Sequence, residues 1–183
     1  MSDLKETKIA SKVVYDGDFL DVRKDTVSLP NGREGDREWI NHPGAVVVIP
    51  ILPNGKIALI RQFRYAVGSE FIELPAGKLD SGEKPLECAK RELEEEIGYK
   101  SDNFEFIANI HPAIGFANEK MSLFLARGLV QTKHNRDVDE FIDLMPTNLE
   151  EALELVWSNK ITDVKTIIGI LWFQKICNNG QSE

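Results

Sequence analysis

The sequence predicts a mixed α+β domain in which strands come first, one acidic helix is inserted, and further strands and C-terminal helices follow. Three observations support this class. The first half is rich in β-branched residues interrupted by turn signals, residues 84–97 repeat apolar side chains at helical spacing, and two more helical patterns end the chain. With 183 residues, the chain is long enough for one sizeable core and too short for two full domains.

The expected strands are separated by turn residues. The segments concerned are 11–15, 19–29, 38–40, 45–52, 56–63, 71–74, 104–111 and 121–126. Residues 45–52 are continuously apolar, which is typical of a strand buried on both faces. The turn Pro53-Asn54-Gly55 leads directly into 56–63 and so predicts a hairpin between these two strands.

The chain is expected to divide near residue 42. A new pattern begins with the buried strand at Ala45, so residues 1–42 are expected to form a small antiparallel sheet in front of the main core. Residues 43–183 then form the main domain.

Three helices are expected. The first spans 84–97, is closed by Gly98 as C-cap, and has its apolar positions at Leu86, Ala89, Leu93 and Ile97. The second begins at a capping box from Thr147 to Glu150 and runs through residue 157. The third is capped by Thr162 and runs through residue 174.

Composition excludes several classes of protein. A formal net charge of −8 argues against a nucleic-acid binder, which generally needs a basic stripe, although bound metal would still allow small phosphorylated ligands. The longest strongly apolar run, 45–52, is far too short to cross a membrane, and the polar N-terminus has no apolar signal core. We therefore expect a cytoplasmic protein without membrane or nucleic-acid partners, whose Cys88 and Cys177 are free.

The helix at 84–97 carries an unusual concentration of acid. Glu92 and Glu96 lie four residues apart and project from one face, with Glu95 beside them. Like charges at this spacing repel each other and invite a compensating cation, for which oxygen ligands favour Mg²⁺ or Mn²⁺. Leu86, Ala89 and Leu93 would anchor the opposite face. A solvated surface helix is the alternative, but it does not explain the glycine-bearing loop 76–82 that precedes the helix.

The whole segment resembles the Nudix box. The matching positions are Gly77, Glu83, Arg91-Glu92-Leu93, Glu95-Glu96 and Gly98, and the usual aliphatic residue after them is here Tyr99. The resemblance implies that Glu92, Glu95 and Glu96 bind metal together with the carbonyl of Ala76, and that Glu83 and Arg91 orient the helix. It also implies a mixed sheet sandwiched between helices, and hydrolysis of a nucleoside diphosphate linked to another group.

Segments outside the box are similar to the ADP-ribose and nucleoside-diphosphate-sugar pyrophosphatase branch of the Nudix family. These segments are 37–46, 59–64, 73–77, 112–119 and 137–142, so the resemblance extends over roughly residues 19–157. It implies a nucleoside diphosphate sugar such as ADP-ribose as substrate, with a nucleoside monophosphate and a sugar phosphate as products. It also implies a homodimer, in which the N-terminal sheet serves dimerisation and base binding.

Five residues are candidates for substrate binding. Arg64 is expected to clamp phosphate, Arg37 contacts phosphate or ribose unless it is a surface charge, and Gly115 lies in the loop after Pro112. Trp39 and Phe19 are candidates for stacking on the base, although Phe19 could equally be a core residue.

The general base is left open between Glu140, for which Asp137 or Asp139 could substitute, and Glu95. Glu140 would act from an acidic loop folding over the metals, and Glu95 from the helix itself. Two other functions also remain open: hydrolysis of damaged nucleoside triphosphates or dinucleoside polyphosphates, and binding of a nucleotide sugar without cleavage. The second is disfavoured because Glu92, Glu95 and Glu96 are all present. The preferred base and sugar and the number of metal ions are not determined by these patterns.

Overall fold

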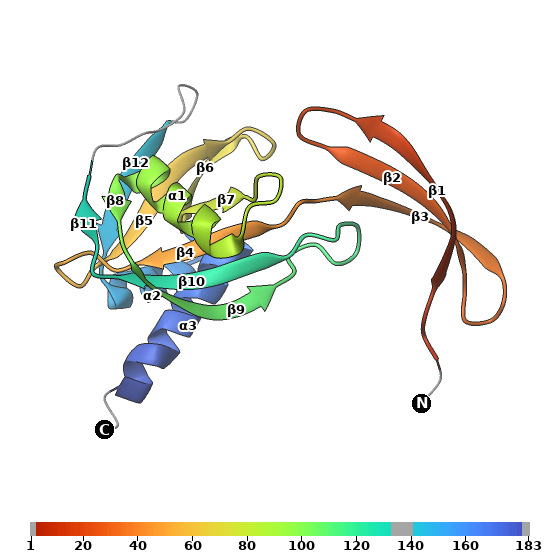
Figure 1. Cartoon of the computed structure of the whole chain (residues 1–183). Coiled ribbons are helices and arrows are strands. Elements are labelled where there is room, and N and C mark those ends of the chain that lie inside the picture. Colours follow the sequence, from red (N-terminus) through yellow and green to blue (C-terminus); the bar gives the residue numbers. More distant parts are fainter. Residues whose placement is uncertain (1–2, 133–140, 181–183) are drawn as a thin grey trace.

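A computed structural model describes residues 3–132 and 141–180. It consists of a layered main body and an N-terminal sheet that stands to one side of it (Figure 1). β3 leads directly from this N-terminal sheet into β4 in the middle of the body (Figure 1).

The N-terminal sheet has three antiparallel strands in the order β1-β2-β3. They are β1 (Thr7–Asp16), β2 (Asp21–Ser28) and β3 (Glu34–Asn41). Every residue of the edge strand β1 is exposed, including apolar side chains such as Val13 and Tyr15. Among the described strands, β1 pairs only with β2, so the sheet presents a long and partly apolar edge.

The main body contains two larger sheets and one short strand pair. Their strands are β4 (Ala45–Pro50), β5 (Ile57–Arg64), β6 (Ser69–Glu73), β7 (Ala76–Lys78), β8 (Tyr99–Lys100), β9 (Asn103–Ile110), β10 (Met121–Arg127), β11 (Val130–Gln131) and β12 (Ile142–Thr147). One sheet has the order β7-β4-β10-β9 and the other β12-β5-β6, while β8 pairs with β11. The first sheet is mixed, because β10 runs parallel to β4 and antiparallel to β9.

Helices cover the two faces of these sheets. They are α1 (Pro85–Ile97), α2 (Leu149–Trp157) and α3 (Val164–Gly180). Val46 and Val48 point from β4 into a core shared with α1, whereas Val47 and Ile49 point into the core shared with α2 and α3. The alternation explains why β4 has no exposed residue, and it confirms the predicted α+β class with a mixed sheet between helices.

The predicted hairpin between β4 and β5 is wrong. The turn at 53–55 does form, and the N–H of Gly55 donates to the carbonyl of Leu52 at 2.8 Å. Beyond it the two strands share only the bridge between Ile51 and Ile57, and then enter different sheets. β4 instead pairs with β7 and β10, which are distant in sequence and which no local turn signal could reveal.

Two of the predicted helix caps are also wrong. The N-cap of α2 is Asn148, whose side chain accepts from the N–H of Glu151 at 2.8 Å. Thr147 belongs to β12 instead, where its hydroxyl donates to the carbonyl of Met145. At α3 the carboxylate of Asp163, not the side chain of Thr162, accepts from the N–H of Thr166 at 3.1 Å.

The predicted end is right for α1 and too early for α3. Gly98 ends α1 in the left-handed conformation, as predicted for its C-cap. Helix α3 runs to Gly180, beyond the predicted end at 174.

Cys88 and Cys177 are free. Along the described ranges, no helix is long and apolar enough to cross a membrane.

Candidate active site

Helix α1 is held against β7 by a very close approach of backbone and side chain. A methyl group added to Gly77 would lie only 1.8 Å from Oε1 of Glu92, so only glycine fits at this position. One turn further, Oε2 of Glu96 accepts from the backbone N–H of Ala76 at 3.1 Å. These two contacts fix the carboxylates of Glu92 and Glu96 beside the loop that begins the Nudix-like segment.

The carboxylates lie on the packed face of α1. Glu92 is 8% exposed and Glu96 4% exposed, in the same buried set as Cys88, Ala89 and Leu93. The expectation that acid and apolar side chains occupy opposite faces is therefore wrong. Leu86, near the start of α1, is 39% exposed and does not belong to the packed face.

Arg91 connects the acidic residues of the loop with those of the helix. Its Nε and Nη2 each donate to Glu83 at 3.0 Å, and Nη1 donates to Glu92 at 2.7 Å and to Glu95 at 2.9 Å. Its Nη2 also reaches the carbonyl of Lys78 at 3.1 Å. The guanidinium group thus joins both sides of the loop–helix junction, an arrangement consistent with the orienting role predicted for Glu83 and Arg91.

These contacts shift the ionisation of the pair. Hydrogen bonding to Arg91 lowers the pKa of Glu83 to about 2, and hydrogen bonding to Glu83 raises the pKa of Arg91. Cys88 lies beneath them, and burial raises the pKa of its thiol to about 12. Cys88 is therefore a packing residue rather than a nucleophile.

The donor set fits a hard divalent cation. Within residues 3–132 and 141–180, no three acidic, His or Cys side chains are grouped as a metal cluster, and Glu92 and Glu95 instead share Arg91. Carboxylate oxygens and a backbone carbonyl are nevertheless the ligands that Mg²⁺ and Mn²⁺ prefer. Glu92, Glu95, Glu96 and the Ala76 carbonyl remain the predicted ligands.

The carboxylate of Glu92 lines a cavity of about 700 Å³. Its walls come from β5–β7, the middle of α1, the start of α3, the first residues of β4 and β10, the loop after β9 and the β1–β2 connection. Of the predicted residues, the cavity brings together Phe19, Arg64, Ala76, Arg91 and Glu92. Phe19 lies over the ammonium group of Lys78, which is 3.8 Å from its ring centroid.

The other predicted substrate residues lie elsewhere. Arg37, Trp39 and Gly115 line a separate hollow of about 260 Å³ between β3 and the loop 114–118. Arg37 is paired with Glu6, and the guanidinium of Arg23 is 6.0 Å from the Trp39 ring centroid. The structure thus does not bring Phe19 and Trp39 into one cavity of this chain. Glu140 lies outside the described residues.

Three further residues of the large cavity were not predicted from the sequence. Glu73 at the end of β6 is 2% exposed and accepts from Nε and Nη2 of Arg64, both at 2.7 Å. It also pairs with Lys165, which is 2.9 Å from Asp163. Burial raises the pKa of Glu73, but its hydrogen bond with Arg64 and the charge of Lys165 outweigh this effect and lower it overall. For Glu73, Lys165 and Asp163, the only local sequence signal was the three-residue spacing between Asp163 and Thr166, which is typical of a helix N-cap.

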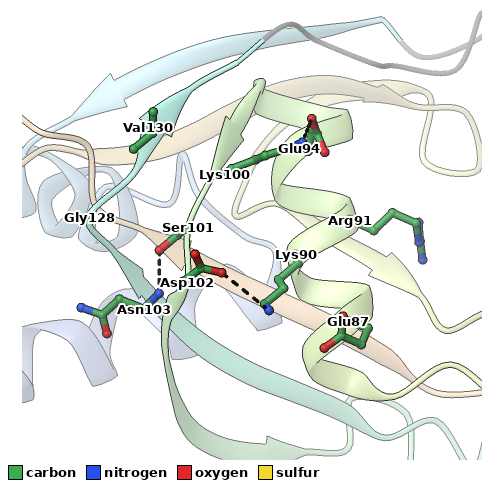
Figure 2. Close-up of a pocket in the computed structure, with 10 residues that line it drawn as sticks. All are labelled: Glu87, Lys90, Arg91, Glu94, Lys100, Ser101, Asp102, Asn103, Gly128 and Val130. Carbon is green, nitrogen blue, oxygen red and sulfur yellow. Dashed lines mark hydrogen bonds and ion pairs between the residues drawn. The ribbon is translucent and has the colours of Figure 1, made fainter.

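A second hollow beside α1 is lined by lysines and acidic residues that do not include the predicted metal ligands. Figure 2 shows that Lys100 pairs there with Glu94 and Lys90 with Asp102, and that Arg91 points away from these residues. The hollow measures about 720 Å³, but neither Glu92 nor Glu96 lines it. Since the charges drawn there pair mainly with each other, we place the candidate site in the cavity beside Glu92.

Comparison with known proteins identifies the family. The NUDIX domain matches residues 41–164, and the nucleoside diphosphate sugar hydrolase N-terminal domain matches residues 6–40. The chain belongs to the Nudix family, as the box at Gly77–Gly98 predicted.

Relatives match nearly the full length of the chain. It is 40% identical to an ADP-ribose pyrophosphatase of Bacillus subtilis, over 95% of both chains. It is 38% identical to a methanol dehydrogenase activator of Bacillus methanolicus, over 93% of both, and 33% identical to an ADP-ribose pyrophosphatase of Mycobacterium tuberculosis, over 89% of this chain and 80% of that one. A crystal structure of an ADP compounds hydrolase aligns with a TM-score of 0.86 at 21% identity, over 96% of both chains, which confirms the fold.

The contact between Gly77 and Glu92 can be tested by Gly77→Ala. The added methyl group must displace the Glu92 carboxylate, so we expect Mn²⁺ affinity to fall by about tenfold or more. Electron paramagnetic resonance of free Mn²⁺ measures this affinity. Gly35→Ala is the control, because its new methyl group meets nothing closer than 3.4 Å. A folded Gly77→Ala variant with unchanged affinity would contradict the assignment.

The Glu83–Arg91 pair predicts a pH-dependent contribution to stability. Because the pKa of Glu83 is lowered in the folded state, its contribution is complete above the ordinary value of 4.5 and is lost as the pH falls towards about 2. At pH 7, Glu83→Gln should reduce the free energy of unfolding by about 1 kcal/mol, given partial screening by solvent. Urea unfolding of both proteins between pH 7 and pH 3 checks this; a stability difference that does not shrink below pH 4.5 would count against the pair.

Proposed function

We propose that this Nudix chain is a Mg²⁺-dependent pyrophosphohydrolase, with Mn²⁺ as a substitute, that cleaves nucleoside diphosphate sugars such as ADP-ribose. The products are a nucleoside monophosphate and a sugar phosphate. One observation carries the proposal: Glu92 and Arg64 line the same cavity, which is large enough for a pyrophosphate and an attached sugar. The names of the relatives from Bacillus subtilis and Mycobacterium tuberculosis support this substrate class.

The residues of the cavity would have complementary tasks in this reaction. Bound Mg²⁺ would supply charge neutralisation at the pyrophosphate oxygens and a more acidic water molecule. Glu92, Glu95, Glu96 and the Ala76 carbonyl would hold it, while Arg91 and Glu83 keep the helix in place. Arg64 binds a phosphate oxygen and fixes the phosphorus in line with the attacking water. Glu140 or Glu95 accepts the proton of that water.

The carboxylate assignment is tested by Glu96→Gln. Glutamine retains an oxygen that can accept from the N–H of Ala76, so the fold should persist while a charged ligand is lost. We expect turnover of ADP-ribose with Mg²⁺ to fall by about a hundredfold or more. Glu87→Gln, an exposed position on the same helix, is the control and should retain full turnover. Full activity of Glu96→Gln would contradict the assignment of Glu96 as a metal ligand.

The substrate class is tested with a panel assayed by release of phosphate from the products. The panel contains ADP-ribose, ADP-glucose, GDP-mannose, UDP-glucose, a diadenosine polyphosphate and nucleoside triphosphates. Preferential turnover of the triphosphates or the diadenosine compound would replace the proposal by that alternative. Binding of ADP-ribose without turnover by the Mg²⁺-loaded protein would identify a sensor.

The proposal includes a cytoplasmic homodimer in which residues 1–42 serve dimerisation and base binding. The exposed apolar side chains of β1 support an interface there, and the placement of Phe19 and Trp39 in different cavities of one chain leaves a role for a second copy. Sedimentation velocity at micromolar concentration should show a dimer, and Val13→Asp should shift it to monomer. A wild-type monomer under these conditions would rule out this part of the proposal.

A further inference from the structure

We propose that Lys165, in the first turn of α3, is a positioning residue that acts through Glu73 to keep Arg64 available for the substrate pyrophosphate. The ligand class in this inference rests on the proposed function. The geometry does not, because all three residues line the same cavity beside Glu92.

Glu73 is a buried carboxylate held between two cations. Nε of Arg64 donates to Oε1 and Nη2 of Arg64 donates to Oε2, both at 2.7 Å. The ammonium group of Lys165 donates to the same Oε2. Glu73 is 2% exposed, whereas the Arg64 side chain is 44% exposed, so Arg64 is the member of the group that faces open solvent in the cavity.

Lys165, the second cation, increases the ability of Arg64 to bind another anion. An arginine that alone neutralises a buried carboxylate has little attraction left for a second anion. Here Lys165 shares the charge of Glu73, and Arg64 retains Nη1, for which no hydrogen bond is found within residues 3–132 and 141–180. Arg64 is thus oriented by a bidentate contact on one side and can donate to a phosphate on the other.

Lys165 is itself fixed in position by the start of α3. Asp163 accepts from the ammonium group of Lys165 at 2.9 Å and from the hydroxyl of Thr166 at 2.5 Å. The Thr166 hydroxyl oxygen in turn accepts from the N–H of Leu74, the neighbour of Glu73, at 2.8 Å. Gly169 allows tight packing here, because a methyl group at that position would lie 2.3 Å from Cδ1 of Leu74. The helix is therefore anchored to the chain directly beside Glu73.

A purely structural role for this ion pair makes a different prediction. Buried ion pairs often contribute little net stability, and loss of one partner mainly destabilises the fold. In that case every variant that loosens α3 would weaken ligand binding in proportion to its loss of stability. A positioning role instead ties ligand affinity to the charge at residue 165.

The experiment measures binding of inorganic pyrophosphate in the presence of EDTA by isothermal titration calorimetry, together with kcat and KM for ADP-ribose with Mg²⁺. For Lys165→Met we expect Kd and KM to rise about tenfold, with kcat changed less than about twofold. Lys165→Arg keeps the charge and should restore both constants to within about threefold of wild type.

Two control variants separate charge from stability. Ile170→Val removes a methyl group from the fully buried side of α3, and should lower the melting temperature while leaving the pyrophosphate Kd near the wild-type value. Lys175→Met removes a lysine from the same helix, beside Trp172, and should change neither constant.

Three results would overturn the inference: unchanged binding by Lys165→Met, equal weakening by Ile170→Val, or no pyrophosphate binding by the wild type. If the wild type cleaves no nucleotide sugar but Lys165→Met still weakens pyrophosphate binding, the proposed function fails and the inference stands.

Discussion

The contact between the Gly77 backbone and the Glu92 side chain is the constraint on which the site depends. It brings an anionic helix face within van der Waals distance of a strand, where any side chain at residue 77 would separate them. A second contact between the same two elements is the hydrogen bond from the N–H of Ala76 to Glu96. Arg91 adds a third connection, because it donates to Glu83 in the loop before the helix. Because β7 pairs with the fully buried β4, the position of the carboxylates is set by the core of the domain and not by a surface loop.

The cavity holds cationic side chains together with the carboxylate-bearing helix. Arg64 and Lys165, with Glu73 between them, line the same cavity as Glu92. In the proposed reaction, a pyrophosphate would contact the Arg64 guanidinium group directly and the carboxylates through metal. This arrangement would allow an overall acidic chain, with a formal charge of −8, to bind a strongly anionic ligand.

Features with a local sequence pattern were predicted well. The acidic helix, its Gly98 cap and the doubly buried strand β4 each follow from spacing within a short segment, and the structure contains all three. The box also led to the correct family. The placement of Glu92 and Glu96 was predicted less well, because helical spacing places two residues on one face without indicating which face is packed.

Features that depend on distant parts of the chain could not be predicted. The parallel pairing of β4 with β10 leaves no local signal, so the turn at 53–55 wrongly indicated a hairpin. The contact between Glu73 and Lys165 spans 92 positions of the sequence, and each residue alone is an ordinary charged side chain. The separation of Phe19 from Trp39 likewise depends on how the β1–β2 connection reaches the main body.

The anchoring of α3 beside Glu73 has a consequence for where the functional unit ends. The NUDIX domain match stops at residue 164, but the contacts to Glu73 and Leu74 come from Lys165 and Thr166, just beyond it. A chain cut at the family boundary would keep the box, Arg64 and Glu73, and would lose the Lys165 and Thr166 contacts to Glu73 and Leu74. With the proposed role of Lys165, the functional unit would be longer than the region by which the family is recognised, and it would include the beginning of a helix whose far end points away from the body (Figure 1).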